Sequence, residues 1–137
     1  MNDRRARRID YVILFVADLE ASIAFYRDVV ELPFKLRGHG YAEFATEGTR
    51  FALFERAKLP ELIGPDPGGA EPPTGPSAEV VILVDDVDRE AGRLSAAGIA
   101  VLAEPTDRPW GHRTLHIGDP DGHVVELAQE IPRTDSA

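Results

Sequence analysis

Two glutamates in the second half of the chain, Glu79 and Glu126, are the side chains best suited to do chemistry. Each lies in a short apolar segment of the kind that forms a buried strand. Side chains alternate between the two faces of a strand, and by this alternation the neighbouring Val80 and Val125 face the helices. Both carboxylates are therefore expected to face one pocket, within one chain or across two chains of a dimer.

Two carboxylates in a pocket of low dielectric repel each other, so the pKa of one of them rises and the pair holds a single proton near neutral pH. Such a pair can act as general acid and general base. His116 lies between two apolar residues that point the other way, which favours the same pocket and the role of a proton shuttle. Two structural alternatives stay open: Glu79 solvated at the mouth of its strand, and Glu126 in an ion pair with Arg113 or another arginine.

An internal repeat organises these residues. The segment from Tyr11 to Leu19 aligns with the segment from Glu79 to Val87 at an offset of 68 residues, apolar against apolar at nearly every step. Each copy predicts a buried strand, an acidic turn and an amphipathic helix. Asp18 and Asp86 are the predicted N-caps of the two helices.

Strand-like segments follow each predicted helix. We expect strands over 34–37, 41–45, 50–55, 101–103, 113–118 and 123–128. The prediction is an α+β fold in which two βαβββ modules form a curved, partly closed mixed sheet around a pocket.

A single domain is expected over residues 9–130. Module 1 spans 9–56, module 2 spans 78–130, and a linker rich in proline and glycine over 57–77 joins them without a helix. Residues 1–8 and 131–137 are expected to be flexible tails.

Composition excludes several classes of function. The formal net charge of −9 argues against nucleic acid or an anionic membrane as a partner. The absence of cysteine excludes disulfides, thiolate metal sites and a cysteine nucleophile. No apolar run is long enough for a signal peptide or a membrane span, so the expected location is the cytoplasm.

The duplicated plan resembles the vicinal oxygen chelate superfamily, which includes glyoxalase I, extradiol dioxygenases and bleomycin-type resistance proteins. The resemblance covers roughly residues 9 to 130. Two stretches carry it: Asp-Leu-Glu-x-Ser-x-x-Phe-Tyr at 18–26 and Asp-Pro-Asp-Gly-His-x-x-Glu-Leu at 119–127. It implies a glyoxalase-like fold, a small-molecule ligand and a homodimer.

The resemblance also implies four metal-ligand positions, which by alignment fall on Tyr11, Leu53, Glu79 and Glu126. Only two of them hold a usual metal ligand, so no cofactor is favoured. A divalent metal would need Glu79, Glu126 and His116 together. Without a metal, Tyr11 completes the predicted catalytic set by donating to a developing enolate oxygen, as an epimerase, isomerase or lyase acting next to a carbonyl requires.

Sequestration of an aromatic compound without turnover, as in the resistance proteins, is the alternative function. The acidic chain suits a cationic drug, and aromatic side chains can stack on planar rings. The predicted ligand-binding residues are Phe15, Leu53, Trp110 and Arg113. A metal-dependent glyoxalase or dioxygenase is the third possibility.

Overall fold

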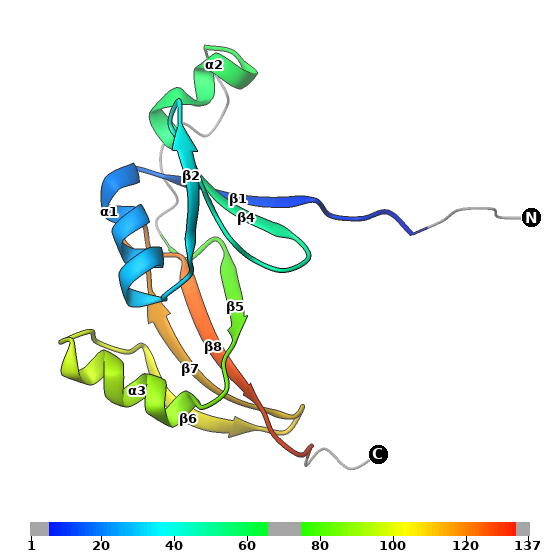
Figure 1. The fold of residues 1–137 in the computed structure, drawn as a ribbon, viewed down its shortest axis with the longest axis vertical. Helices are drawn as coiled ribbons and strands as arrows, with labels where there is room; N and C mark the ends of the chain where they lie inside the picture. Colours follow the sequence, from blue (N-terminus) through cyan, green and yellow to red (C-terminus); the bar gives the residue numbers. More distant parts are fainter. Residues whose placement is uncertain (1–5, 66–74, 134–137) are drawn as a thin grey trace, which may run out of the picture. The chain divides into compact units, whose positions relative to one another are not determined.

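The computed structural model describes residues 6–65 and 75–133, and the chain divides into two compact units, residues 1–70 and 71–137. Each unit contains one four-stranded mixed sheet that stays open rather than closing into a barrel (Figure 1). The order strand, helix, three strands occurs in both units, as the repeat predicts. The α+β class and the duplicated βαβββ plan are therefore confirmed.

Unit 1 follows the order strand, helix, three strands, with two short helical segments after them. Its elements are β1 (Tyr11–Val16), α1 (Leu19–Ala24), the π-helical turn η1 (Phe25–Val29), β2 (Phe34–Gly38), β3 (Tyr41–Phe44), β4 (Arg50–Glu55), the 3-10 turn η2 (Arg56–Lys58) and α2 (Leu59–Ile63). The sheet order is β1-β4-β3-β2, with β4 parallel to β1 and antiparallel to β3.

Unit 2 repeats this plan with a longer helix. Its elements are β5 (Glu79–Leu83), α3 (Val87–Ala96), β6 (Ala103–Arg108), β7 (His112–Gly118) and β8 (Val124–Glu130). The sheet order β5-β8-β7-β6 matches that of unit 1 strand for strand, and β8 is again parallel to the first strand and antiparallel to the next.

Both predicted helix N-caps are confirmed. The Asp18 carboxylate accepts a hydrogen bond from the Ala21 amide at 3.1 Å, and the Asp86 carboxylate accepts one from the Arg89 amide at 3.1 Å. Each bond satisfies an amide that has no partner inside the helix. The two caps fix where the chain turns from the first strand of each unit into its helix.

Helices cover one face of each sheet and bury its apolar side chains. In unit 1 the ring of Tyr26 lies 5.0 Å from that of Phe51 and 6.1 Å from that of Phe44, centroid to centroid, which packs η1 onto β3 and β4. In unit 2 Leu115 and Leu127 are fully buried on adjacent strands. Truncating either leucine to alanine would destabilise the fold by about 2–5 kcal/mol.

Two elements differ from the sequence prediction. Residues 59–63 form the helix α2 inside the segment predicted as a linker without a helix, because Pro60 stands in the first turn, where its missing N–H has no helical partner to lose. Strand β6 spans 103–108 instead of 101–103. It is a polar strand at the outer edge of its sheet, where solvent faces it and apolar alternation is not required.

Parts of the predicted linker and tails, namely residues 1–5, 66–74 and 134–137, lie outside the described residues. Among the helices that the structure describes, none is both long and apolar enough to cross a membrane.

Candidate functional site

Three neighbouring strands of unit 2 position the two glutamates and the histidine. Glu79 begins β5, Glu126 lies on β8 and His116 lies directly opposite Glu126 on β7. Side chains at these positions point away from the face covered by α3, because Leu115 and Leu127 on the same strands are buried under it. The predicted alternation thus holds, and the three side chains share the open face of the sheet.

His116 lies between the two carboxylates. Its Nε2 atom is 3.0 Å from Oε1 of Glu126 and 3.6 Å from Oε2 of Glu79. The side chains of His116 and Glu126 are 19% and 12% exposed, whereas that of Glu79 is 47% exposed. The carboxylates are therefore bridged by an imidazole instead of forming the direct pair that the sequence predicts, and only Glu79 is open to a ligand.

The surroundings of the imidazole define where its proton lies. Nδ1 of His116 is buried and has no hydrogen-bond partner within the part of the chain that the structure describes. A proton on Nδ1 would leave a buried donor unsatisfied, which is more costly than an unsatisfied acceptor lone pair. Of the two neutral tautomers, the one with its hydrogen on Nε2 avoids this unsatisfied donor and lets Nε2–H donate to Glu126 at 3.0 Å, while the Glu79 carboxylate lies 3.6 Å from the same nitrogen.

The same three residues also form a candidate metal site. One ligand atom from each of Glu79, His116 and Glu126 lies within 4.8 Å of the others, which matches a divalent cation in number and spacing of donors. A histidine that binds a metal usually donates its second N–H to a carboxylate, a carbonyl or water, and Nδ1 of His116 lacks such a partner among the described residues. The donor set fits a metal incompletely, and no step is derived through one.

Tyr11 and Phe15 belong to unit 1 and lie on the open face of its sheet. Each is 38% exposed. The Tyr11 hydroxyl accepts a hydrogen bond from Nη1 of Arg50, and the Arg50 guanidinium also lies 4.7 Å from the centre of the Tyr11 ring. Because the hydroxyl oxygen accepts this bond, its own hydrogen is available to a ligand.

Leu53 does not line the open face. It is fully buried, and it pairs with Leu14, which packs into the same helix-covered core. Tyr11 stands opposite Arg50 in unit 1, and Glu79 stands opposite Val124 in unit 2. Glu126 follows Val124 by two residues, so its equivalent in unit 1 is Ala52, two residues after Arg50. The alignment that selected Leu53 was wrong by one residue, and a shift of one residue reverses the face of a strand.

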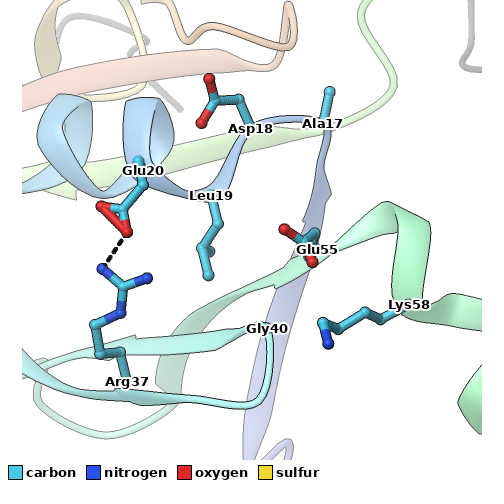
Figure 2. A pocket seen from close by; sticks show the side chains of 8 residues that line it. All are labelled: Ala17, Asp18, Leu19, Glu20, Arg37, Gly40, Glu55 and Lys58. Carbon is cyan, nitrogen blue, oxygen red and sulfur yellow. Dashed lines mark ion pairs between the residues drawn. The ribbon is translucent and has the colours of Figure 1, made fainter.

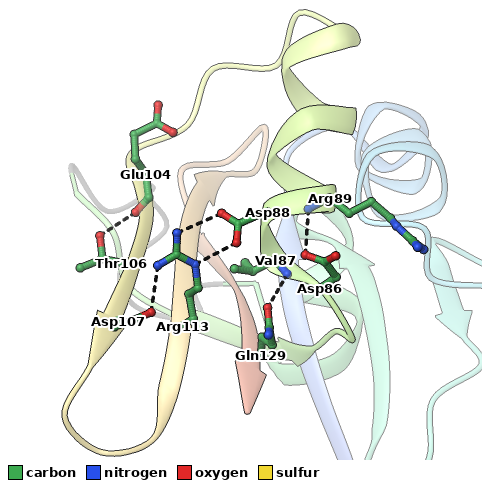
Figure 3. Close-up of polar contacts among 9 residues, drawn as sticks. All are labelled: Asp86, Val87, Asp88, Arg89, Glu104, Thr106, Asp107, Arg113 and Gln129. Atoms are coloured by element: carbon green, nitrogen blue, oxygen red, sulfur yellow. Dashed lines mark hydrogen bonds and ion pairs between the residues drawn. The ribbon is translucent and has the colours of Figure 1, made fainter. Parts of the chain in front are cut away.

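Arg113 also lies on the face opposite His116. Its guanidinium donates to both carboxylate oxygens of Asp88 on α3 at 3.0 Å and to Asp107 on β6 at 2.9 Å (Figure 3). These contacts occupy the side chain and hold the helix to the sheet. The alternative ion pair between Arg113 and Glu126 is therefore not formed, while the ligand contact of Arg113 stays a prediction.

Trp110 lies in the hairpin turn between β6 and β7 and is 52% exposed. Its backbone carbonyl accepts a hydrogen bond from Arg133 at 3.4 Å, while the indole ring remains open to solvent. Trp110 thus retains the accessibility that the sequence analysis expects of a ligand contact.

Sequence reasoning missed a buried carboxylate in unit 1. Glu43 stands opposite Ala52 as His116 stands opposite Glu126, and it is only 4% exposed. Its oxygens accept hydrogen bonds from the Tyr41 hydroxyl at 2.6 Å and from Nζ of Lys35 at 3.1 Å. The bond from Tyr41 is the main cause of a lowered Glu43 pKa. Comparing the repeats strand by strand, beyond their first strands, would have found this residue.

Two cavities lie elsewhere. One of about 450 Å³ in unit 1 is lined by both acidic and basic side chains, and its residues are Ala17, Asp18, Leu19, Glu20, Arg37, Gly40, Glu55 and Lys58 (Figure 2). An ion pair between Arg37 and Glu20 closes part of it. One of about 350 Å³ lies at the ends of β5 and β8 in unit 2. Neither is lined by Glu79, His116 or Glu126.

The chain belongs to the Glyoxalase/Bleomycin resistance protein/Dioxygenase superfamily, whose sequence pattern it matches over residues 8–127. This confirms the resemblance to the vicinal oxygen chelate superfamily. The chain is similar to the uncharacterized protein YwbC of Bacillus subtilis, with 30% identity covering 90% of this chain and 98% of that protein.

Solved structures agree with this assignment. A glyoxalase/bleomycin resistance protein/dioxygenase from Nocardioides has 29% identity and a TM-score of 0.79, covering 93% of this chain and 86% of that one. A lactoylglutathione lyase from Agrobacterium tumefaciens has 28% identity and a TM-score of 0.71, covering 91% and 95%. These names span several chemistries, so the fold alone does not define the reaction.

Proposed function

We propose that this chain moves a proton at the carbon next to a carbonyl group of a small molecule, as an epimerase, isomerase or lyase does. The observation that supports the proposal is the position of His116 Nε2 between the carboxylate oxygens of Glu126 and Glu79. Such an arrangement holds one carboxylate in place and leaves the other ready to accept a proton.

Glu79 is the proposed base. It is the most exposed of the three groups, and its contact with the imidazole is the longer of the two. The substrate C–H bond breaks, its proton moves to the Glu79 carboxylate, and its electron pair forms an enolate. In an isomerase Glu79 returns the proton to a neighbouring carbon, and in a lyase the enolate expels a leaving group.

Glu126 and His116 position this base. The largely buried Glu126 accepts a hydrogen bond from Nε2–H of His116, and this bond fixes the tautomer and the plane of the imidazole. The imidazole held in this way places Nε2 3.6 Å from the Glu79 carboxylate. Loss of Glu126 is therefore expected to weaken catalysis through His116 without direct contact to the substrate.

The test is exchange of solvent deuterium into a panel of small carbonyl compounds, followed by proton NMR. Removing the base with Glu79→Gln is expected to slow exchange about a hundredfold to ten-thousandfold, the usual contribution of a general base. Glu130→Gln is the matched control, since Glu130 is exposed on the same strand as Glu126 and takes no part in the proposed chemistry.

Exchange at the wild-type rate in Glu79→Gln would refute the proposal. If compounds bind, as followed by quenching of the single tryptophan, yet are recovered unchanged and unlabelled, the chain sequesters its ligand as the resistance proteins of the family do.

Metal-dependent chemistry is the second candidate, supported by the spacing of ligand atoms around Glu79, His116 and Glu126. If the metal-independent proposal holds, exchange continues at the same rate after treatment with EDTA and is unchanged by added Ni²⁺, Mn²⁺, Fe²⁺ or Zn²⁺. Elemental analysis of the purified protein provides the independent measurement. Loss of exchange with EDTA and its recovery with one of these ions would establish the metal-dependent class instead.

A further inference from the structure

The open face of the unit 2 sheet carries an arginine beside the proposed proton-transfer residues. Arg108 ends β6, where it stands opposite His112, and Thr106 stands opposite Thr114. Residues directly opposite each other in an antiparallel pair point to the same face. Arg108 therefore shares a face with Thr114 and, two residues further along β7, with His116.

One hydrogen bond fixes the direction of this arginine. Nε of Arg108 donates to Oγ1 of Thr114 at 3.0 Å, and Thr114 is fully buried. The two terminal nitrogens of Arg108 have no partner among residues 6–65 and 75–133. Arg113 provides the contrast, since Asp88 and Asp107 occupy its guanidinium on the other face.

The charges around Arg108 favour an anionic ligand in one orientation. The other ionisable groups of this face are the carboxylates Glu79, Glu126 and Glu130 and the two histidines of β7, and no carboxylate oxygen among them comes within 4.0 Å of Arg108. Glu79 and Glu126 repel an anion at one end of the face, whereas Arg108 attracts it at the other end, where Glu130 stands opposite His112 in the same cross-strand row. An anionic group is therefore favoured at Arg108 over the end that carries Glu79 and Glu126.

We propose that Arg108 binds a carboxylate group of the substrate, so that the substrate class is small carboxylic acids that also carry a carbonyl group. With Nε engaged by Thr114, the edge formed by the two terminal nitrogens of Arg108 is free, and its two parallel N–H groups match the two oxygens of a carboxylate. Thr114 and His116 are about 6.8 Å apart along the strand, a distance that a chain of a few carbon atoms spans. This inference rests on the proposed function, because it places the reacting carbon at Glu79.

Binding alone, without turnover, tests the inference. Titrating the isotope-labelled full chain by NMR with 5-oxohexanoate and with 2-hexanone compares two probes that differ in the carboxylate and whose carbon chains span the required distance. The wild-type chain is expected to bind the acid more tightly. Arg108→Gln is expected to weaken binding of the acid about tenfold to a hundredfold, the range for a charged hydrogen-bond pair, and to leave the ketone unaffected.

Two further variants keep the result interpretable. Arg89→Gln removes the same charge from an exposed position on α3 and is expected to bind the acid as the wild type does. Arg108→Lys keeps the charge but loses the fork, so intermediate affinity is expected. Thermal unfolding of each variant shows whether it still folds. If Arg108→Gln does not fold, the affinity of Arg108→Lys for the acid is compared with that of Arg89→Gln instead.

The inference is overturned if the wild-type chain fails to bind the acid or does not prefer it to the ketone. It is also overturned if Arg108→Gln or, where that variant does not fold, Arg108→Lys binds the acid as tightly as Arg89→Gln. Failure of the proposed function looks different, because 5-oxohexanoate would then bind in an Arg108-dependent manner while the panel showed no deuterium exchange.

Discussion

Glu43 shows how strongly one residue can depend on its partners. Its buried carboxylate accepts hydrogen bonds from Tyr41 and Lys35, and both bonds lower the Glu43 pKa, with burial opposing them. Burial, together with the same bond to Glu43, raises the Tyr41 pKa, so the tyrosine stays protonated and remains a donor. The ionised form of Glu43 is thus the form that the fold stabilises.

A pH-dependent contribution to stability follows from this. Because the Glu43 pKa is lower in the folded than in the unfolded chain, the stabilisation is present above the usual value near 4.5 and is lost as pH falls through the folded pKa. Glu43→Gln is expected to lower the free energy of unfolding at pH 7 by about 1–3 kcal/mol. Urea unfolding at pH 7 and at pH values below 4.5 measures both effects.

The variant is expected to lose less stability on acidification than the wild type does. Glu47→Gln, at an exposed position in the turn before β4, is the control. As pH falls, it is expected to lose as much stability as the wild type does. Parallel stability curves for wild type and Glu43→Gln across the acid range would contradict the assignment of the lowered pKa to this residue.

At the scale of elements, the start of α3 connects the helix to the sheet that carries the candidate site. The Asp86 cap satisfies the Arg89 amide, and the Gln129 side chain of β8 accepts a hydrogen bond from the Val87 amide at 2.9 Å (Figure 3). Asp88 in the same turn holds Arg113 of β7. One helical turn therefore fixes the two strands on which His116 and Glu126 lie.

Removing the cap tests this connection. Asp86→Ala is expected to lower the free energy of unfolding by about 0.5–2 kcal/mol, the usual effect of losing an N-cap side chain. Glu104→Ala, at an exposed position on the edge strand β6, should change stability by less than about 0.5 kcal/mol. Equal values for the two variants, from chemical unfolding, would show that the cap contributes nothing.

At the scale of the whole molecule, the duplication was the feature easiest to predict. Apolar periodicity and the caps Asp18 and Asp86 define the first strand and helix of each unit, because burial and capping act over a few neighbouring residues. Alternation also placed Glu79, His116 and Glu126 on one face. Local patterns are sufficient for such features.

Features that depend on strand register were not predictable in the same way. Leu53 was selected in place of Ala52 because loop lengths differ between the repeats and one residue decides which face a side chain occupies. Arg113 was expected at a ligand, yet Asp88, 25 residues earlier in the sequence, binds it. Arg108 escaped notice because its edge strand lacks the apolar pattern of a strand. Each of these depends on contacts distant in sequence.

The strand-by-strand equivalence of the two units bears on the history of the protein. Tyr11, Glu43 and Ala52 occupy in unit 1 the positions of Glu79, His116 and Glu126 in unit 2. If the halves descend from one duplicated ancestral segment, their backbones have kept the same strand pairing while these three side chains have diverged. Redundancy of this kind frees one copy to drift or specialise while the other retains its chemistry, and the same scaffold can then acquire new reactions by changing three positions at a time.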